Sequence, residues 1–193
     1  LRKGENHLTL KIYRWSTGSY LECQDFWRIS GIERDVWLSA EPQVSLRDFH
    51  ITSTLDDSYH DGIFRLQTEL RNTTDKRQRT TVSYELRSDD GGTIVAASSQ
   101  SIDIKDTVAF ADFSATIPNV RPWSSEQTQL YTLYVTVQNG KEQEVIPYRV
   151  GFRRIEIKER LCRDGRTLPC LLVNGQPIKL KGVNIHEHNP YTG

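Results

Sequence analysis

Two histidines flank a glutamate near the end of the chain, and their spacing suits ligand binding. His186 and His188 enclose Glu187 in the sequence NIHEHNP, and on a strand residues i and i+2 point to the same face. The pair could ligate one metal ion, although two ligands are too few for a closed zinc site. Imidazole can also donate or accept a hydrogen bond, which suits a hydroxyl-rich substrate. A purely structural interpretation is hydrogen bonding to neighbouring strands.

A second group combines aromatic, amide and charged side chains in the sequence QDFWR, residues 24–28. Aromatic rings can stack on the apolar faces of sugars, while carboxylate and amide groups can bind sugar hydroxyls. Two other interpretations stay open. Trp27 could belong to a hydrophobic core, and Asp25 and Arg28 could form a buried ion pair.

The most regular strand pattern lies far from both groups, over residues 130–137 (LYTLYVTV). Apolar and aromatic side chains alternate there with threonines and a tyrosine, which is typical of a half-buried strand. Asn139-Gly140 follows as a hairpin turn signal. Tyr131 begins the strand after a proline-rich corner, which is typical of the tyrosine corner of immunoglobulin-like sandwiches.

The region around this strand predicts an all-β, antiparallel sandwich. Turn signals recur about every ten residues and no long stretch has a helical period, so βαβ crossovers are not expected. The predicted strands span 44–54, 62–70, 80–87, 93–97, 100–104, 109–117, 130–137 and 144–152.

The flanks differ from this central region. Residues 8–13 alternate like a strand with one solvated face, and a further strand is predicted over 31–38. After the sandwich, short strands are predicted at 154–157, 171–173 and 178–180, with Asn174-Gly175 as a hairpin turn. Cys162 and Cys170 could face each other across a hairpin, or both could be free thiols.

Composition excludes several classes of function. The net charge is zero, so no broad field favours nucleic acid or an anionic membrane. No apolar run approaches the roughly 20 residues that cross a bilayer, and no signal peptide opens the sequence. A soluble protein is expected, with cytoplasm and periplasm both open. The chain begins at Leu1 and contains no methionine, which suggests an internal fragment of a longer protein.

Two motifs carry a family resemblance: QDFWRISGIERDVWL (24–38) and GVNIHEHNP (182–190). Together with LYTLYVTV and VGFRRIEI in the same order, they resemble the LacZ-type β-galactosidases of glycoside hydrolase family two. The resemblance covers essentially the whole chain. It implies the end of a jelly-roll sugar-binding domain over 1–40, an immunoglobulin-like β-sandwich over 41–152, and the start of a TIM-barrel catalytic domain over 153–193.

The resemblance also implies roles for the two polar groups. His186 should contact galactosyl hydroxyls from the end of the first barrel strand, where TIM-barrel enzymes place functional residues. Asp25 should reach the sugar's C6 hydroxyl and a bound sodium ion. Arg28, Glu187 and His188 would be supporting groups.

The implied activity is hydrolysis of terminal β-D-galactosides with retention. This mechanism needs two carboxylates about 5 Å apart, and the resemblance places both, with the magnesium ligands, outside residues 1–193. We therefore expect no catalytic residue, no cofactor and no activity in the fragment alone. The intact enzyme would use magnesium and sodium, bind a β-galactoside rather than nucleic acid or membrane, and form a homo-oligomer. Alternatives are a β-glucuronidase or β-mannosidase of the same family, or a non-catalytic immunoglobulin-like binding module.

Overall fold

The computed structural model describes residues 2–21, 31–32, 34–89, 92–161 and 165–185. Contacts divide the chain into two units. Ala40–Lys179 forms one, and Leu1–Ser39 with Leu180–Gly193 forms the other.

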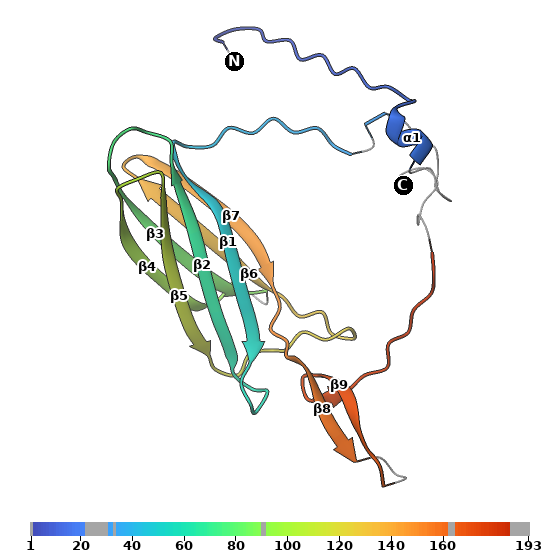
Figure 1. Ribbon diagram of the computed structural model, residues 1–193. Coiled ribbons are helices and arrows are strands. Elements are labelled where there is room, and N and C mark those ends of the chain that lie inside the picture. The colour runs from blue at the N-terminus through green and yellow to red at the C-terminus, as the bar shows by residue number, and fades with distance from the viewer. Residues whose placement is uncertain (1, 22–30, 33, 90–91, 162–164, 186–193) are drawn as a thin grey trace. The chain divides into compact units, whose positions relative to one another are not determined.

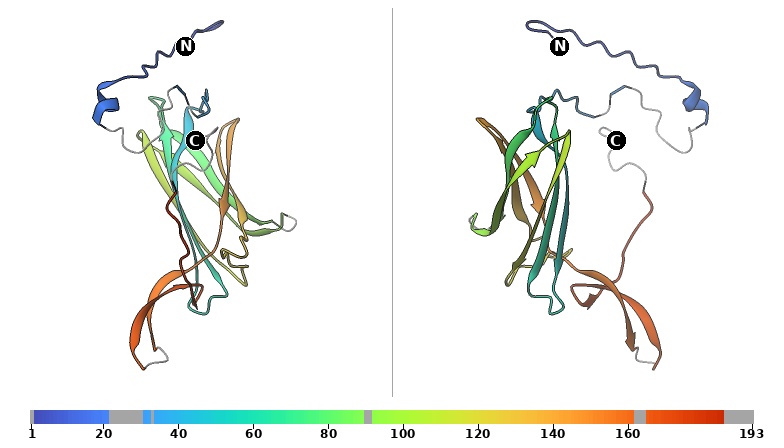
Figure 2. Two further views of the ribbon diagram at one scale, coloured as in Figure 1. Left: turned by 90° about the vertical axis from the view of Figure 1, so that its right-hand side faces the viewer. Right: turned by 60° about the vertical axis from the view of Figure 1, so that its left-hand side comes forward.

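Seven antiparallel strands of the Ala40–Lys179 unit form a sandwich of two sheets (Figures 1 and 2). The first sheet has the order β1-β2-β5 and the second the order β4-β3-β6-β7. In an immunoglobulin constant-type sandwich the fourth strand joins the first sheet, whereas here β4 pairs with β3. The strands are β1 (Val44–Leu55), β2 (Gly62–Asn72), β3 (Gln78–Ser88), β4 (Ile94–Ile104), β5 (Val108–Ile117), β6 (Tyr131–Asn139) and β7 (Glu142–Val150).

Every second side chain along the strands points into the space between the two sheets and fills it. On β6 the predicted apolar face is buried while the intervening residues are only half-buried, and β2 and β3 show the same period. Three aromatic rings meet in this core, with Tyr84 lying 5.2 Å from Phe64 and 5.3 Å from Phe113 between ring centroids. The predicted all-β sandwich is therefore confirmed.

Two predicted strands are one strand in the structure. The sequence suggests separate strands over 93–97 and 100–104, but β4 runs without interruption from Ile94 to Ile104. Its serines at positions 98 and 99 pair with Tyr84 and Ser83 of β3. Continuous pairing to a central strand satisfies the backbone there, so the weak β propensity of serine does not end the strand.

The two Asn-Gly turns differ in register. Asn174 and Gly175 both have positive φ, at 51° and 73°, and occupy the two-residue loop of a hairpin as predicted. Asn139 instead pairs with Glu142, so the loop of the β6–β7 hairpin is Gly140-Lys141. Gly140 alone has positive φ there, at 58°, which suits a turn with glycine at its first central position.

Tyr131 forms the predicted tyrosine corner. Its hydroxyl accepts a hydrogen bond of 2.9 Å from the backbone N–H of Arg121, ten residues upstream. The ring is buried and packs edge-on against Phe152, with centroids 5.4 Å apart. The contact fixes the start of β6 against the segment that precedes it.

Removing this hydroxyl is expected to weaken the sandwich. Tyr131→Phe keeps the ring and deletes the acceptor, so the free energy of unfolding should fall by about 1 kcal/mol. Urea denaturation followed by circular dichroism measures the change. Tyr148→Phe is the control, because this half-exposed ring packs on Phe49 without its hydroxyl, and a change below about 0.5 kcal/mol is expected. Equal stability of Tyr131→Phe and wild type would contradict the role of the corner.

A small third sheet follows the sandwich, in the order β10-β9-β8. Its strands are β8 (Ile155–Leu161), β9 (Thr167–Val173) and β10 (Gln176–Pro177), so the first two are longer than the sequence predicts. The strand predicted over 178–180 does not form, although the Ile178 N–H donates a 3.2 Å hydrogen bond to the Leu171 carbonyl.

The Leu1–Ser39 part of the chain differs from the sequence prediction. Among its described residues the regular structure is one short helix, α1 (Thr17–Leu21), and residues 8–13 and 34–38 form no strand. A strand is stable only when a neighbour satisfies its backbone, and the side chains of Leu8 (80 %) and Trp37 (83 %) are exposed. In the described residues no helix has the length and apolar character that crossing a bilayer requires.

Candidate functional site

The residues that the sequence singles out for chemistry lie outside the described residues. Asp25 and Arg28 fall in the gap at 22–30, and His186, Glu187 and His188 fall in the gap at 186–193. Their roles, including sodium binding by Asp25, stay predictions. Over the described ranges, no three His, Cys, Asp or Glu side chains lie close enough to hold a metal ion.

The cysteine prediction is tested at one position. Cys170 on β9 is half-buried and carries a free thiol, whereas Cys162 lies in the gap at 162–164. The Cys170 Sγ lies 3.8 Å from the Leu171 carbonyl oxygen.

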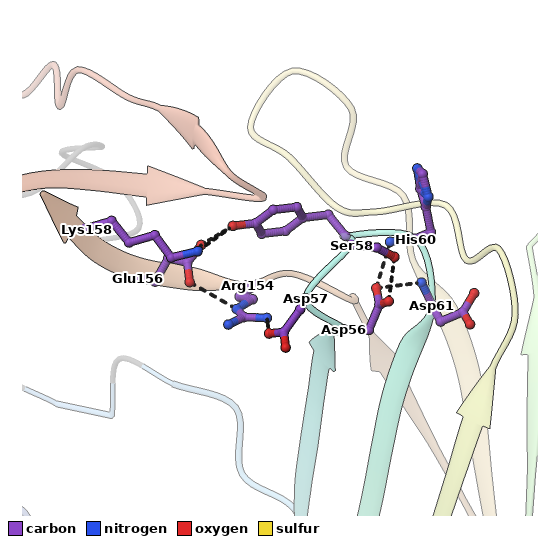
Figure 3. A network of polar contacts seen from close by, with 9 residues as sticks. Asp56, Asp57, Ser58, His60, Asp61, Arg154, Glu156 and Lys158 are labelled. Atoms are coloured by element: carbon purple, nitrogen blue, oxygen red, sulfur yellow. Dashed lines mark hydrogen bonds and ion pairs between the residues drawn. The ribbon is translucent and has the colours of Figure 1, made fainter. Parts of the chain in front are cut away.

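A network of polar contacts joins the third sheet to the sandwich, and we call it the hairpin junction (Figure 3). Glu156 and Lys158 lie on β8 and Arg154 just precedes it, so the period of two places all three on one face. Tyr59 reaches them from the β1–β2 loop. The Glu156 carboxylate accepts a hydrogen bond from the Tyr59 hydroxyl and lies 3.1 Å from both Arg154 Nε and Lys158 Nζ.

Further contacts close the hairpin junction around the Tyr59 ring. The Lys158 ammonium donates a 3.0 Å hydrogen bond to the Tyr59 hydroxyl. Arg154 also binds the Asp57 carboxylate at 2.7 Å, and its guanidinium lies 5.7 Å from the ring centroid. The Tyr59 hydrogen bond, then Lys158 and Arg154, lower the pKa of Glu156. The same hydroxyl, with Glu156, raises the pKa of Lys158, so both groups are charged at neutral pH.

The β1–β2 loop is shaped to present Tyr59. Asp56 accepts backbone N–H bonds from His60 at 2.9 Å and Asp61 at 3.0 Å, and a 2.5 Å bond from the Ser58 hydroxyl. The Ser58 hydrogen bond is the largest of the effects that lower the Asp56 pKa to about 2. Tyr59 has φ of 62°, a left-handed conformation that costs free energy unless its surroundings hold it.

The turn between β9 and β10 also binds this region through Asn174. Its backbone N–H donates to the Arg154 carbonyl at 2.8 Å, and its side-chain oxygen accepts from the Arg154 N–H at 2.9 Å. Its amide nitrogen donates to the Trp123 carbonyl at 3.0 Å. A Cβ on the next residue, Gly175, would lie 2.8 Å from the Tyr59 ring, so only glycine fits beneath it.

This arrangement orients the hairpin rather than performing a reaction. Glu156 binds Tyr59, Arg154 and Lys158 at once, which leaves no activated nucleophile among the four. Since the contacts come from a loop, a strand and a turn at once, they fix the direction in which the hairpin leaves the sandwich.

Sequence reasoning missed the hairpin junction. The sequence DDSYHDG (56–62) has turn composition, but nothing in it indicates that Tyr59 adopts positive φ. The alternation of Arg154, Glu156 and Lys158 with two isoleucines is the signal that could have indicated a strand with one charged face.

Acid should loosen the β1–β2 loop. The Asp56 pKa is about 2 in the folded chain against 3.8 for an unperturbed aspartate. The stability that its ionised carboxylate contributes is therefore fully present above about pH 4 and is lost as pH falls through 2. Asp56→Asn should therefore lower the melting temperature near neutral pH and show a smaller decrease between pH 4 and 2 than wild type. Circular dichroism melts across pH 5 to 2 measure both. Asp75→Asn, which removes an exposed turn carboxylate, is the control, and an unchanged acid profile in Asp56→Asn would contradict the account.

Two family models match the chain in sequence order. Residues 44–153 match glycosyl hydrolases family 2, and residues 1–42 match the sugar binding domain of glycosyl hydrolases family 2.

This chain belongs to glycosyl hydrolases family 2.

Curated relatives from this family align over nearly the whole chain. It is 36 % identical over 193 residues to a β-galactosidase of Halalkalibacterium halodurans, covering 99 % of this chain and 18 % of the relative. It is 37 % identical over 200 residues to a β-galactosidase of Klebsiella pneumoniae, covering 100 % of this chain and 18 % of that relative. The family 2 chain therefore spans less than one fifth of the length of these relatives.

Solved structures support the fold. The crystal structure of Bacteroides uniformis β-glucuronidase superimposes with a TM-score of 0.71 and 21 % identity, over 88 % of this chain and 20 % of that one. At this identity the likeness establishes the sandwich architecture of the family and leaves substrate choice to other observations.

Proposed function

We propose that this family 2 chain is part of a β-galactosidase that hydrolyses terminal β-D-galactosides. The observation that carries the proposal is the 36 % identity to a β-galactosidase, which extends over 99 % of the chain. Several further β-galactosidases align at similar identity. The β-glucuronidase structures share the fold at 21 % identity, which is too distant to shift the substrate assignment.

In this proposal the residues that contact the substrate lie in the two segments that flank the sandwich. The sugar-binding family model over 1–42 supports assigning residues 1–40 to the end of a jelly-roll domain that carries Asp25. Residues 41–152 are the sandwich, and 153–193 begin a TIM barrel whose first strand ends near His186. The hairpin junction is the brace that holds the start of this third segment on the sandwich.

In this proposal the chain's own groups bind and orient the sugar. His186 hydrogen-bonds galactosyl hydroxyls, and Asp25 accepts a hydrogen bond from the C6 hydroxyl. A carboxylate oxygen is also a suitable ligand for sodium, which would neutralise charge beside that hydroxyl. Arg28, Glu187 and His188 hold these two side chains in place. The acid/base and nucleophilic carboxylates, separated by about 5 Å in a retaining enzyme, are assigned to sequence beyond these 193 residues, as are the magnesium ligands.

A comparison of substrates tests the proposal. A longer protein that carries this segment should cleave a nitrophenyl β-D-galactoside with a higher kcat/KM than the matching β-glucuronide or β-mannoside. The 193-residue chain alone should release no nitrophenol from any of them, because the two carboxylates are missing. Preference for the glucuronide, or turnover by the 193-residue chain, would overturn the proposal.

A further inference from the structure

The outer face of the β1-β2-β5 sheet carries polar side chains in aligned rows. The strand register places His50 beside Gln67, and Gln67 beside Asp112, so that one row crosses all three strands. Neighbouring rows place Phe110 beside Glu69 on one side and Ser114 beside Arg65 on the other. We call His50, Gln67, Phe110 and Asp112 the sheet-face cluster.

Polar side chains of this cluster have unused hydrogen-bonding capacity. Within the described part of the chain, the side chains of His50, Gln67 and Asp112 make no hydrogen bond or ion pair with protein groups. Several other exposed charged side chains of the sandwich are paired, as in Arg71–Glu41, Arg77–Asp103 and Arg149–Asp89. The cluster therefore offers an imidazole, an amide and a carboxylate to a ligand, a set that both donates and accepts.

The cluster lies at the centre of a hollowed surface. A hollow of about 430 Å³ is lined by the cluster together with Asp48, Phe49, Thr68 and Glu69. A second hollow of about 370 Å³ shares His50, Gln67 and Asp112 with it. Small-ligand sites commonly have volumes of about 300–1,000 Å³, and the first hollow, which is open to solvent, has room for a monosaccharide lying against the sheet.

Phe110 adds an apolar platform beside these polar groups. Its side chain is 65 % exposed, although burying a phenylalanine ring stabilises a folded chain by about 1.5–3 kcal/mol. The C–H face of a pyranose is the apolar surface of a sugar, and an exposed ring next to hydroxyl-binding groups suits it.

The charge of the first hollow selects among sugars. Its lining includes three carboxylates, from Asp48, Glu69 and Asp112, and no lysine or arginine. Glu69 is ion-paired with Arg47 at 3.0 Å, and the other two carboxylates have no such partner in the described chain. A uronic acid would meet like charge in the first hollow, whereas neutral hydroxyls can donate to the carboxylates. The lining of the second hollow includes Arg65, so the sugar is placed in the first hollow.

We infer that the outer face of the β1-β2-β5 sheet is a secondary binding site for a neutral saccharide. The sugar ring lies against Phe110 while His50, Gln67 and Asp112 bind its hydroxyls. This site goes beyond the proposed hydrolysis, since it needs neither Asp25 nor His186 nor the missing carboxylates. It would concentrate saccharide on the protein independently of turnover.

Amide NMR of the ¹⁵N-labelled 193-residue chain tests the site by titration with galactose, lactose and glucuronate. Galactose and lactose should shift the Gln67 side-chain amide and the backbone amides of the three strands, saturating in the millimolar range, about −4 kcal/mol in binding free energy. Glucuronate should bind at least fivefold more weakly than galactose. Because the readout is binding by the sandwich, its failure is distinguishable from failure of the proposed β-galactosidase activity.

Variants separate this site from general surface contact. Phe110→Ala and Gln67→Ala should each weaken lactose binding at least fivefold while leaving the amide spectrum of the core unchanged. Thr116 is exposed on β5, the strand that carries Phe110, and lies outside the lining of both hollows. Thr116→Ala should therefore bind lactose as wild type does. The inference is overturned if neither neutral sugar shifts the cluster, if glucuronate binds as well as galactose, or if Phe110→Ala binds like wild type.

Discussion

Replacing Phe64 with alanine is expected to lower the free energy of unfolding of the sandwich by about 3–5 kcal/mol. Phe64 is completely buried at the centre of the core, and its ring lies 5.2 Å from Tyr84. Truncation removes the transfer free energy of the ring and leaves a cavity that packed strands cannot collapse to fill. Since a domain of this size is stable by only about 5–15 kcal/mol, the variant should be close to unfolding at 37 °C.

Urea denaturation of the 193-residue chain measures this loss, with circular dichroism reporting the β signal. Phe110→Ala is the matched control, because it deletes the same ring from the exposed face of the same sheet. Its effect should stay within about 0.5 kcal/mol. If the two variants were equally destabilised, the assignment of the inner and outer faces of the β1-β2-β5 sheet would be wrong.

Replacing His186 with phenylalanine should reduce kcat/KM for a β-galactoside about tenfold to 150-fold in the longer enzyme that we propose. The expected loss is about 1.5–3 kcal/mol, the range for a hydrogen bond to a charged partner, because charge develops on the sugar in the transition state. Phenylalanine keeps a planar ring of similar size and removes both imidazole nitrogens. Initial rates with a nitrophenyl β-D-galactoside give the ratio.

His60→Phe is the control for this experiment. His60 is exposed on the β1–β2 loop and contributes its backbone N–H, not its ring, to Asp56. Its kcat/KM should stay within about twofold of wild type. A His186→Phe enzyme that also retained its activity within twofold would contradict a direct contact between His186 and the sugar.

The sandwich was predictable because its signals are local and mutually consistent. Alternation over residues 130–137 predicts β6 and its buried face, and the proline-rich corner before Tyr131 predicts the tyrosine corner that the structure contains. Such agreement between pattern, turn and corner is what makes a sequence specify one fold.

The hairpin junction was not predictable, because it depends on a backbone conformation and on long-range contacts. Tyr59 reaches Glu156 and Lys158 across 97 and 99 residues of sequence. No short-range pattern encodes this meeting, and a tyrosine at positive φ runs against the usual preference of that region for glycine or asparagine. The register of the β6–β7 hairpin likewise depends on the pairing of Asn139 with Glu142. Its loop is therefore Gly140-Lys141 and not the Asn139-Gly140 pair that the sequence indicates.

The candidate sugar-binding residues were found by motif rather than by physical pattern. A lone aspartate or histidine has many structural roles. Asp25 and His186 are candidates only because of the sequences around them, QDFWRISGIERDVWL and GVNIHEHNP. The family assignment over 44–153 agrees with the resemblance on which those motifs rest.

The stereochemistry of sugar release tests the central claim, that this chain serves a retaining β-galactosidase. Proton NMR of a β-D-galactoside during its first turnovers by the longer enzyme resolves the two anomers of free galactose before they equilibrate. The account predicts that β-galactose appears first and is followed by slow conversion to the α-anomer. Initial release of α-galactose, or no release of galactose under conditions in which a β-glucuronide is cleaved, would contradict it.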